Sequence, residues 1–409
     1  MLEGNVLYGQ SGGPSSAINA SALGVILEAM EHKDVIHKIY MMHHGIVGAI
    51  NDDIIDVTDE DVAELKKLRH TSGAYFGNVR YKLLDWKDSE KDYRKILKTL
   101  KKYNIRYFFY NGGNDSMDTC NKISTYLQKV GYECRVMGIP KTIDNDLPIT
   151  DHTPGYGTSA KFIANSMIDI DLDNASYPQG RVIVVEIMGR HAGWLAASSA
   201  LANLQGHGPD LIYVPEIPFE MDKFYADVDK VYQKKKRCLV AVSEGIVDKN
   251  GSFIFQVGKK VDAFGHLRLG GVCQVLSTNV ADALGVNSVA LELSFLQRGA
   301  CRIASKVDIE EGEGVGREAV KRAIEGVSDK MIAITRLSSK PYKIEYTLAD
   351  LSAVANYENK LPRDMINEEG NNVTEKFIEY AAPLIDGELD DTFTSGLIDV
   401  PHLKNYRPL

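Results

Sequence analysis

Residues 140–146 read Pro-Lys-Thr-Ile-Asp-Asn-Asp and come directly after the apolar run Val136-Met137-Gly138-Ile139. The apolar run predicts a buried strand, and the polar cluster predicts a loop at the carboxyl end of that strand. In open α/β folds, ligands bind in the crevice outside the carboxyl ends of the strands. Taken alone, Asp-Asn-Asp is also compatible with an ordinary turn. Whether this stretch is a ligand-binding site or an ordinary turn depends on whether other segments of the chain show the same pattern.

The order of strand, polar loop and helix recurs on both sides of this stretch. Each of five further predicted strands ends in a glycine-rich or charged loop: Asn5–Gly9, Arg106–Tyr110, Arg181–Ile187, Cys238–Val242 and Val289–Leu296. Helices are predicted between them, for example over Ala17–Met30 and Met117–Gln128. This alternation predicts an α/β fold with two similar-sized lobes, each a mostly parallel sheet flanked by helices.

Composition narrows the class of protein. The chain has 409 residues, 44% hydrophobic and 25% charged, with a formal net charge of −9. The negative charge argues against a nucleic-acid-binding protein. Five scattered cysteines, without a Cys-x-x-Cys pair, indicate a reducing compartment and argue against zinc. No apolar run approaches the ~18 residues of a membrane span, and no signal peptide is recognised, so a cytoplasmic protein is expected.

The polar loops carry residues that suit phosphate chemistry. Gly12 and Gly13 precede a helix, where backbone N–H groups can hold an anion. Asn114 and Asp115 follow another strand and could bind Mg²⁺ through oxygen atoms, although either residue could instead be a helix N-cap. Asp144 could accept a proton from a hydroxyl, with Lys141 holding an anionic leaving group, a combination that suits phosphoryl transfer to a sugar hydroxyl.

Three further loops add charged candidates. Arg190, at the end of one predicted strand, could clamp a phosphate. Glu244 could accept hydrogen bonds from sugar hydroxyls, and Arg181 and Arg298 could bind a substrate phosphate. For Glu244 and the two arginines, an ordinary surface role is equally compatible with the sequence. His191 is interpreted as structural.

Together the segments Thr142–Asp146, Met188-Gly189-Arg190, Ser243-Glu244-Gly245 and Leu296–Gly299 resemble the phosphofructokinase family in order and spacing. The resemblance runs from Asn5 to about Arg336. It implies phosphoryl transfer to the 1-hydroxyl of fructose 6-phosphate, giving fructose 1,6-bisphosphate, in glycolysis or gluconeogenesis.

The resemblance also implies residue roles. Asp144 falls on the catalytic base, with Arg190 and Lys141 stabilising the transferred group. The expected sugar-phosphate residues are Thr142, Asp144, Asp146, Arg181, Met188, Gly189, Arg190, Glu244, Phe295 and Arg298, and the expected donor residues are Gly12, Arg80, Asp115, Ser116 and Lys141. Arg181 matches an arginine that reaches a neighbouring subunit's pocket, so a homo-oligomer, dimer or tetramer, is expected.

Two positions bear on the phosphoryl donor. Members that use ATP resemble Gly-Gly-Asp-Gly-Ser at 112–116 and have glycine at 141, whereas this chain has Asp115 and Lys141. In members that use pyrophosphate, an acidic side chain fills the space of a nucleotide α-phosphate, and the lysine meets the terminal phosphates. A pyrophosphate donor with Mg²⁺, and a reaction that runs readily in both directions, is therefore expected.

Three residues depart from the family pattern. Asn114 replaces the usual magnesium-linked Asp, Phe295 replaces a His or Tyr at the sugar phosphate, and Val289 replaces a second subunit-crossing arginine. These departures keep two alternatives open. One is an ATP-dependent kinase for fructose 6-phosphate or sedoheptulose 7-phosphate, and the other is a non-catalytic regulatory subunit that binds phosphorylated metabolites.

The same resemblance predicts the domain organisation. Residues 1–155 are predicted as the donor-phosphate lobe, completed by part of 300–360, because Thr153-Pro154-Gly155-Tyr156 interrupts the strand–helix pattern. Residues 156–299 are predicted as the sugar-phosphate lobe, and residues 300–409 as C-terminal segments that pack on both lobes.

Overall fold

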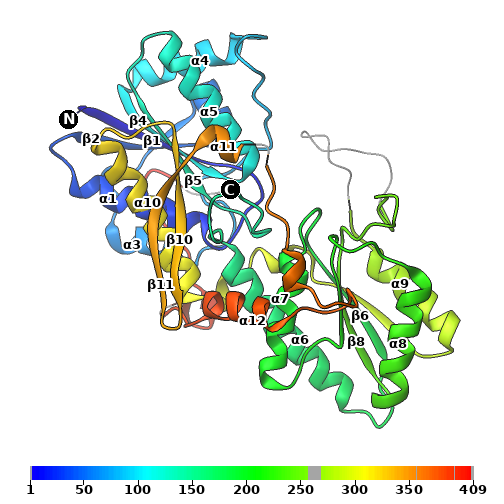
Figure 1. The fold of residues 1–409 in the computed structure, drawn as a ribbon. Helices are drawn as coiled ribbons and strands as arrows, with labels where there is room; N and C mark the ends of the chain where they lie inside the picture. The colour runs from blue at the N-terminus through cyan, green and yellow to red at the C-terminus, as the bar shows by residue number, and fades with distance from the viewer. Residues whose placement is uncertain (1, 257–268, 356, 391, 407–409) are drawn as a thin grey trace.

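The computed structural model describes residues 2–256, 269–355, 357–390 and 392–406, which form two lobes built on separate sheets (Figure 1). The larger sheet has the strand order β11-β10-β5-β4-β1-β2-β3. Its strands are β1 (Gly4–Gln10), β2 (Ile36–Met42), β3 (Ile54–Asp56), β4 (Ile105–Gly112), β5 (Arg135–Pro140), β10 (Lys330–Ser339) and β11 (Tyr342–Asp350). Strands β2, β1, β4, β5 and β10 are parallel, and β3 and β11 add antiparallel edges.

The second sheet is parallel throughout and has the order β7-β8-β6-β9. Its strands are β6 (Val182–Ile187), β7 (Leu211–Tyr213), β8 (Cys238–Ser243) and β9 (Ser288–Glu292). A short hairpin, β12 (Phe393–Thr394) and β13 (Leu397–Ile398), stands apart from both sheets. The predicted α/β class is confirmed, with the first sheet larger than the second.

Helices cover both faces of each sheet because neighbouring residues on a strand point to opposite sides. In β4, Tyr107 and Phe109 pack in one core while Phe108 and Tyr110 pack in another. The helices are α1 (Ile18–Glu31), α2 (Ile46–Asn51), α3 (Val62–Lys66), α4 (Lys91–Lys102), α5 (Asn114–Lys129), α6 (Tyr156–Ala175), α7 (Trp194–Ser198), α8 (Met221–Lys235), α9 (Val272–Leu284), α10 (Lys306–Ile324), α11 (Leu351–Val354) and α12 (Glu375–Ala381). None of the described helices combines the length and apolar character that a membrane span requires.

The last hundred residues contribute to both lobes. Helix α10 and strands β10 and β11 belong to the first lobe, whereas Phe377 on α12 packs in the core of the second. Further on, Leu403 packs in the first lobe again, and the backbone N–H groups of Lys404 and Asn405 donate to Glu60. The division of the chain at residues 155 and 299 stays a prediction.

Several elements differ from the sequence-based predictions, and three of them show the physical reasons. The strand predicted over 289–296 ends at Glu292, and residues Ser294–Gln297 form a 3₁₀ helix instead. Helix α5 begins at Asn114 rather than Met117, because the backbone N–H groups of Ser116 and Met117 already bond to the Gly113 carbonyl. Strand β11 was not predicted, since its alternation of exposed and half-buried residues offers little apolar signal at the sheet edge.

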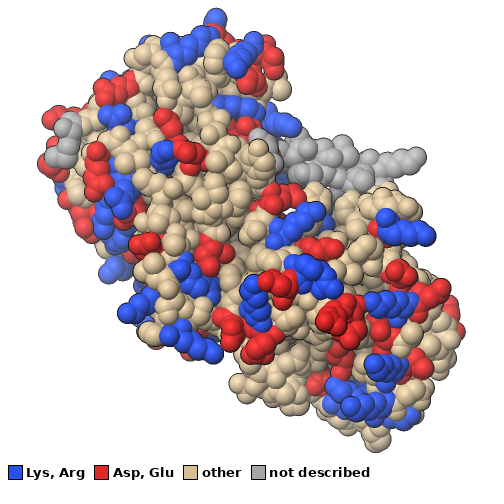
Figure 2. Space-filling model, viewed as in Figure 1, with Lys and Arg blue, Asp and Glu red and all other residues tan. Residues whose placement is uncertain are grey.

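Acidic and basic side chains are interspersed over the surface of both lobes in the view of Figure 2. The cationic run Lys234–Arg237 lies at the exposed end of α8, where Lys235 pairs with Asp210. The run is therefore a solvated helix end within a surface of mixed charge.

Helices α1 and α10 approach each other closely through glycines on both sides. A Cβ atom on Gly24 would lie 2.1 Å from the carbonyl oxygen of Glu313, and one on Gly316 would lie 2.2 Å from that of Ser21. Only residues without a side chain fit at these two points. Because α1 directly follows the Gly12-Gly13 loop, this contact holds the loop against the body of the first lobe.

We expect Gly316→Ala to destabilise the protein by about 2 kcal/mol, since the new methyl group meets backbone that cannot move away alone. Urea unfolding measures this effect. Glu310→Ala, an exposed position on the same helix, is the control and should change stability by less than about 0.5 kcal/mol. Equal stability of the two variants would contradict the close-contact argument.

Candidate active site

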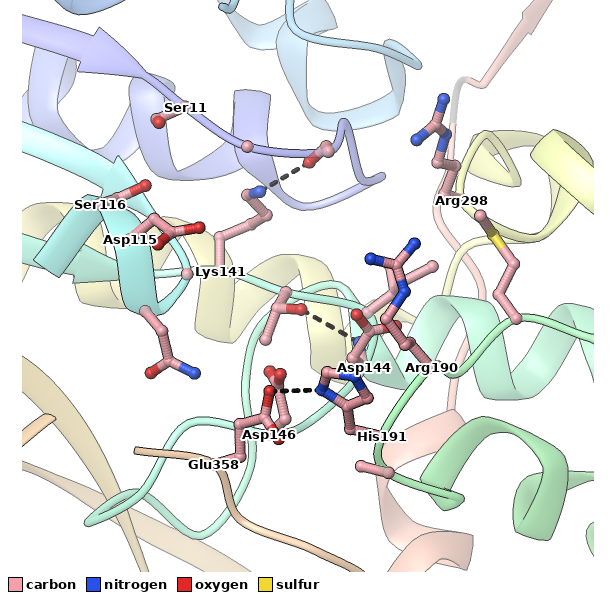
Figure 3. A pocket seen from close by; sticks show the side chains of 18 of the residues that line it. Ser11, Asp115, Ser116, Lys141, Asp144, Asp146, Arg190, His191, Arg298 and Glu358 are labelled. Carbon is pink, nitrogen blue, oxygen red and sulfur yellow. Dashed lines mark hydrogen bonds and ion pairs between the residues drawn. The ribbon is translucent and has the colours of Figure 1, made fainter. Parts of the chain in front are cut away.

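A cavity of about 590 Å³ lies where the two lobes meet, at the carboxyl ends of strands from both sheets (Figure 3). The loops after β1, β4 and β5 line it from the first lobe, and the loops after β6 and β8 line it from the second. Thirteen of the predicted site residues line it: Gly12, Arg80, Asn114, Asp115, Ser116, Lys141, Thr142, Asp144, Asp146, Met188, Arg190, Glu244 and Arg298.

The glycine loop after β1 holds the lysine of the loop after β5. Lys141 Nζ donates a hydrogen bond of 2.6 Å to the carbonyl oxygen of Gly13, and its side chain is only 3% exposed. Gly12 has φ +76°, and a Cβ atom there would lie 3.3 Å from Lys141 Nζ, so glycine allows the lysine to approach. The Lys141 ammonium therefore lies beside the backbone of the Gly12-Gly13 loop, where both could bind a phosphate.

The loop that carries Asp144 is held in a compact turn. The backbone N–H of Asp144 donates to Thr142 Oγ1 at 3.1 Å. Asn145 has φ +56°, a conformation that Asn tolerates well, and its Oδ1 accepts from the backbone N–H of Thr153 at 3.0 Å. This turn places the carboxyl groups of Asp144 and Asp146 on the cavity wall (Figure 3).

The second lobe supplies the opposite wall. Glu244 Oε1 accepts a hydrogen bond of 3.4 Å from the backbone N–H of Gly189, which links the loops after β6 and β8. A Cβ atom on Gly245 would lie 2.0 Å from the Arg190 carbonyl oxygen, so glycine is required where these loops touch. The contact holds Arg190 facing the cavity.

Burial and charge set the protonation of these groups. Burial raises the pKa of Asp144, while the positive charges of Lys141 and Arg190 act against that rise. Burial lowers the pKa of Lys141 to about 8, against the charge of Asp144. Burial and then the charge of Asp144 raise the pKa of Glu244 to about 7. A carboxylate with a raised pKa next to a cation is suited to accept a proton from an alcohol.

Asn114 and Asp115, in the first turn of α5, have the donor atoms that a hard divalent cation prefers. Both residues line the cavity, and Asn114 Oδ1 is a buried oxygen without a hydrogen-bond partner among the described residues. An unpaired buried oxygen next to a carboxylate fits a metal ligand set completed by phosphate and water. These residues are compatible with the expected Mg²⁺.

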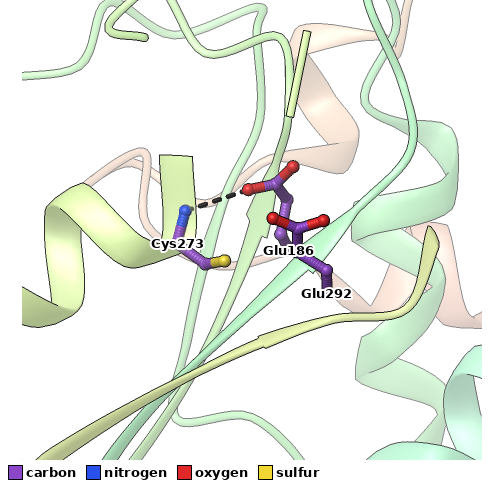
Figure 4. Close-up of side chains that lie close together, drawn as sticks. All are labelled: Glu186, Cys273 and Glu292. Carbon is purple, nitrogen blue, oxygen red and sulfur yellow. Dashed lines mark hydrogen bonds between the residues drawn. The ribbon is translucent and has the colours of Figure 1, made fainter. Parts of the chain in front are cut away.

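A second group of donor atoms lies outside the cavity. Glu186, Cys273 and Glu292 bring ligand atoms within 4.8 Å of one another (Figure 4). The Glu186 carboxylate, however, accepts hydrogen bonds of 2.9–3.0 Å from the backbone N–H groups of Gly271 and Cys273. The contacts make Glu186 a cap for the start of α9, which accounts for its buried charge without a metal ion.

Three predicted site residues are not among the described residues that line the cavity. Gly189 acts through its backbone, as described above. Arg181 precedes β6, at the opposite end of the strand from the cavity, and its guanidinium lies 5.1 Å from the centre of the Tyr177 ring. Phe295 is 67% exposed, and its ring supports the guanidinium of Arg298 at 4.4 Å. Phe295 therefore positions an arginine rather than lining the cavity.

Comparison with known proteins agrees with this geometry. The family model described as Phosphofructokinase matches residues 5–299. The chain belongs to the phosphofructokinase family. It is 44% identical to the pyrophosphate--fructose 6-phosphate 1-phosphotransferase of Halomonas elongata, over 100% of this chain and 98% of that protein. The pyrophosphate-dependent phosphofructokinase of Nitrosospira multiformis has a crystal structure similar to this one, with a TM-score of 0.90, 40% identity, and coverage of 98% of this chain and 97% of that one.

A second solved relative leads to the same family. The crystal structure of the pyrophosphate-dependent phosphofructokinase of Marinobacter aquaeolei has a TM-score of 0.88 and 38% identity, and covers 98% of this chain and 97% of that one. Both likenesses extend beyond residue 299, so the C-terminal segments are part of the shared fold of these phosphofructokinases.

Among the described residues that line the cavity, Tyr357 and Glu358 lie outside all the predicted loops, and His191 was interpreted as structural. Tyr357 and Glu358 come from the C-terminal part of the chain, after α11, with no strand or glycine loop before them. His191 Nδ1 lies 2.8 Å from Glu358 Oε1. The only signal for His191 was its place next to Arg190, and nothing in the local sequence marked the other two.

A buried ionic network supports the Asp144 loop from behind. Asn145 Nδ2 donates to the Tyr380 hydroxyl at 2.7 Å, and that hydroxyl donates to the Asp151 carbonyl oxygen at 2.8 Å. Next to it, His152 Nδ1 lies 2.8 Å from Asp151 Oδ2 and Nε2 lies 2.6 Å from Glu311 Oε2. Burial would lower the pKa of His152, but Glu311 and Asp151 outweigh it and raise that pKa to about 9.

His152 should therefore make stability depend on pH. A histidine with a folded pKa above its unfolded pKa stabilises the fold fully below the unfolded value, and that stabilisation is lost as pH rises through the folded value. We expect the free energy of unfolding to fall by up to about 3 kcal/mol between pH 6.5 and pH values above 9.

Urea unfolding across this pH range, on the wild type and on His152→Gln, measures the effect. The variant should be less stable at low pH, because Glu311 loses its buried partner, and its stability should depend less on pH over the same range. An unchanged pH dependence in the variant would contradict a protonated His152. His37→Gln, at an exposed histidine on β2, is the matched control.

Proposed function

We propose that this chain transfers a phosphoryl group from pyrophosphate to the 1-hydroxyl of fructose 6-phosphate, giving fructose 1,6-bisphosphate and inorganic phosphate. The observation that carries this proposal is the cavity between the lobes, in which a half-buried Asp144 carboxyl faces the cations Lys141 and Arg190. The full-length similarity to pyrophosphate--fructose 6-phosphate 1-phosphotransferases supports both substrates.

We infer the following roles for the residues. Asp144 accepts the proton of the 1-hydroxyl, while the oxygen of that hydroxyl forms a bond to the terminal phosphorus of pyrophosphate. The bridging P–O bond breaks and inorganic phosphate leaves, with Lys141 and Arg190 stabilising the negative charge on the transferred and departing groups. The phosphoanhydride bond of pyrophosphate is exchanged for a phosphate ester bond, with inorganic phosphate rather than a nucleotide as the leaving group, and we infer that the reaction runs readily in both directions.

The two ends of the cavity divide the substrates between them. Gly12, Arg80, Asp115, Ser116 and Lys141 lie at the glycine-loop end and suit a small phosphate donor. Thr142, Asp146, Met188, Glu244 and Arg298 also line the cavity and suit the sugar phosphate, with the Arg298 guanidinium near Gly13 of the glycine loop. Asn114 and Asp115 would hold Mg²⁺, which when bound spreads the negative charge of the phosphate oxygens.

We also infer the assembly and the location of the protein. Because Arg181 lies away from this chain's cavity, its expected role requires a second copy of the chain, and we infer a homo-oligomer, dimer or tetramer. All five cysteines are buried and unpaired, which supports a reducing, cytoplasmic location.

Replacing the proposed base tests the mechanism. We expect Asp144→Asn to lower turnover by about 10²- to 10⁴-fold, the usual contribution of general base catalysis, while both substrates still bind. Steady-state kinetics with pyrophosphate and fructose 6-phosphate, and calorimetric binding of each, measure the two effects. Turnover near that of the wild type in a folded variant would remove Asp144 from the mechanism.

Replacing the donor-end residues tests the choice of donor. We expect Asp115→Gly combined with Lys141→Gly to admit ATP, because the substitutions remove a carboxylate from the α-phosphate space and a cation from the terminal phosphates. Turnover of fructose 6-phosphate with either donor is measured. Asp118→Asn, one turn further along α5, is the control and should keep the wild-type donor.

The same assay on the wild type separates the alternatives. Turnover with ATP alone would keep the family and overturn the pyrophosphate donor. Binding of sugar phosphates without turnover from either donor would favour a regulatory subunit. A double variant that folds and still rejects ATP would show that Asp115 and Lys141 are not what excludes the nucleotide.

A further inference from the structure

A segment from the C-terminal part of the chain enters the active-site cavity. It follows α11 on the first lobe and leads to the 3₁₀ helix Arg363–Met365 and α12 on the second. Tyr357 and Glu358 line the cavity, and Figure 3 shows Glu358 directed toward His191 and Asp146. We call residues 357–361 the crossing segment.

Hydrogen bonds attach the crossing segment to a catalytic loop of each lobe. The backbone N–H of Asn359 donates to the carbonyl oxygen of Asp146 at 2.7 Å. On the other side, Trp194 Nε1 donates to the Asn359 carbonyl oxygen at 2.9 Å. A single residue, Asn359, thus joins the Asp144–Asp146 loop to the helix that follows Arg190.

A buried carboxylate strengthens the second attachment. Glu216 Oε1 accepts from the backbone N–H of Leu361 at 2.9 Å and from that of Gly193 at 2.9 Å. Gly193 belongs to the loop that carries Arg190 and His191. The crossing segment and this loop therefore share one acceptor, and a shift of either one disturbs the other.

The side chain of Glu358 adds an ionic contact inside the cavity. Its Oε1 lies 2.8 Å from His191 Nδ1, and the two side chains are 39% and 41% exposed, so water and substrate both have access. His191 directly follows Arg190. Holding the imidazole therefore also restricts the backbone that presents the Arg190 guanidinium.

The pair also acts on the carboxyl groups through its charges. Burial raises the pKa of Asp144 most, and beyond that Glu358 raises it while His191 lowers it. The same two residues act in the same directions on Asp146. The other charged groups that face Asp144 are Lys141 on its own loop, Arg190 after β6, Glu244 after β8, and Arg298.

We propose that Glu358 is a positioning residue for the phosphoryl transfer: it holds His191 beside Asp144 and Asp146, and so makes the acceptor half of the cavity depend on the crossing segment. The proposal rests on the function proposed above. It adds that a residue far along the chain, outside the glycine loops and strand ends, adjusts the geometry and charge around the base.

The test uses Glu358→Gln and His191→Gln in the full-length protein. Gln keeps the shape of Glu358 and can accept from the imidazole, but it removes the charge. We expect each variant to lower kcat about 10- to 100-fold, as a small misplacement of catalytic groups does, without changing the KM for pyrophosphate. The kcat of the double variant should be no lower than that of the less active single variant, because both substitutions break the same contact.

The pH profile of kcat/KM for fructose 6-phosphate distinguishes positioning from a merely structural role. Without the negative charge of Glu358, Asp144 ionises more easily, so the acid limb should move to lower pH in Glu358→Gln. Because His191 lowers the pKa of Asp144, the acid limb should move to higher pH in His191→Gln. These opposite shifts are expected only if both charges act on the base.

Glu368→Gln, at an exposed acid of the same C-terminal region, is the matched control and should behave as the wild type. Thermal unfolding establishes that each variant is folded, and if Glu358→Gln is not, His191→Gln and its pH profile decide. Unchanged kcat and pH profile, shifts in the same direction, or multiplied losses in the double variant would overturn the proposal. A wild type without turnover would instead overturn the proposed function.

Discussion

The structure depends on one constraint: the opposite charges of Lys141 and Asp144 are held away from water between the two sheets. Lys141 is buried and Asp144 is half-buried. Each shifts the pKa of the other in the direction that favours its charged form, against the effect of burial. An isolated buried charge costs several kcal/mol, so neither group could keep its charge there without the other and the arginines around them. The glycine loop, the turn at Thr142–Asp146 and the second lobe can all be understood as the enclosure that this arrangement requires.

Parallel sheets provide that enclosure because all their strands present carboxyl ends at one edge. Two such edges facing each other bring loops from residues 11–14, 113–116, 141–146, 188–192 and 244 around one cavity, although they are distant in the chain. Gly245 then allows an approach to the Arg190 carbonyl that any side chain would prevent, and Gly12 adopts a positive φ beside Lys141. The crossing segment bonds to both edges through Asn359, so the spacing of the two walls depends on a contact made late in the chain.

The strand-end loops were predictable because their information is local. An apolar run followed by a polar cluster marks both the strand and the edge at which it ends, and the loops after β1, β4, β5, β6 and β8 meet at the cavity for that reason. Arg80, which follows no strand, was expected only from the family resemblance. Prediction failed where the signal was not local. The strand predicted to reach residue 296 ends at Glu292, and β11 carries too little apolar contrast to be recognised at a sheet edge. Phe295 lies beside the Arg298 guanidinium, and its role at the substrate stays a prediction.

The sequence by itself therefore determined the α/β class, the family and the residues with the chemistry to bind phosphate and accept a proton. The class and the residue chemistry follow from side-chain type and short-range periodicity, and the family follows from the resemblance of motifs in their order and spacing; the chain carries all of these before it folds. Only the tertiary structure decided that Glu358 faces His191 across the cavity, that Arg181 lies away from it, and that Asn145 stands on a buried network around His152. Those relations join residues more than a hundred positions apart, or depend on which end of a strand faces the cavity, and packing alone sets them.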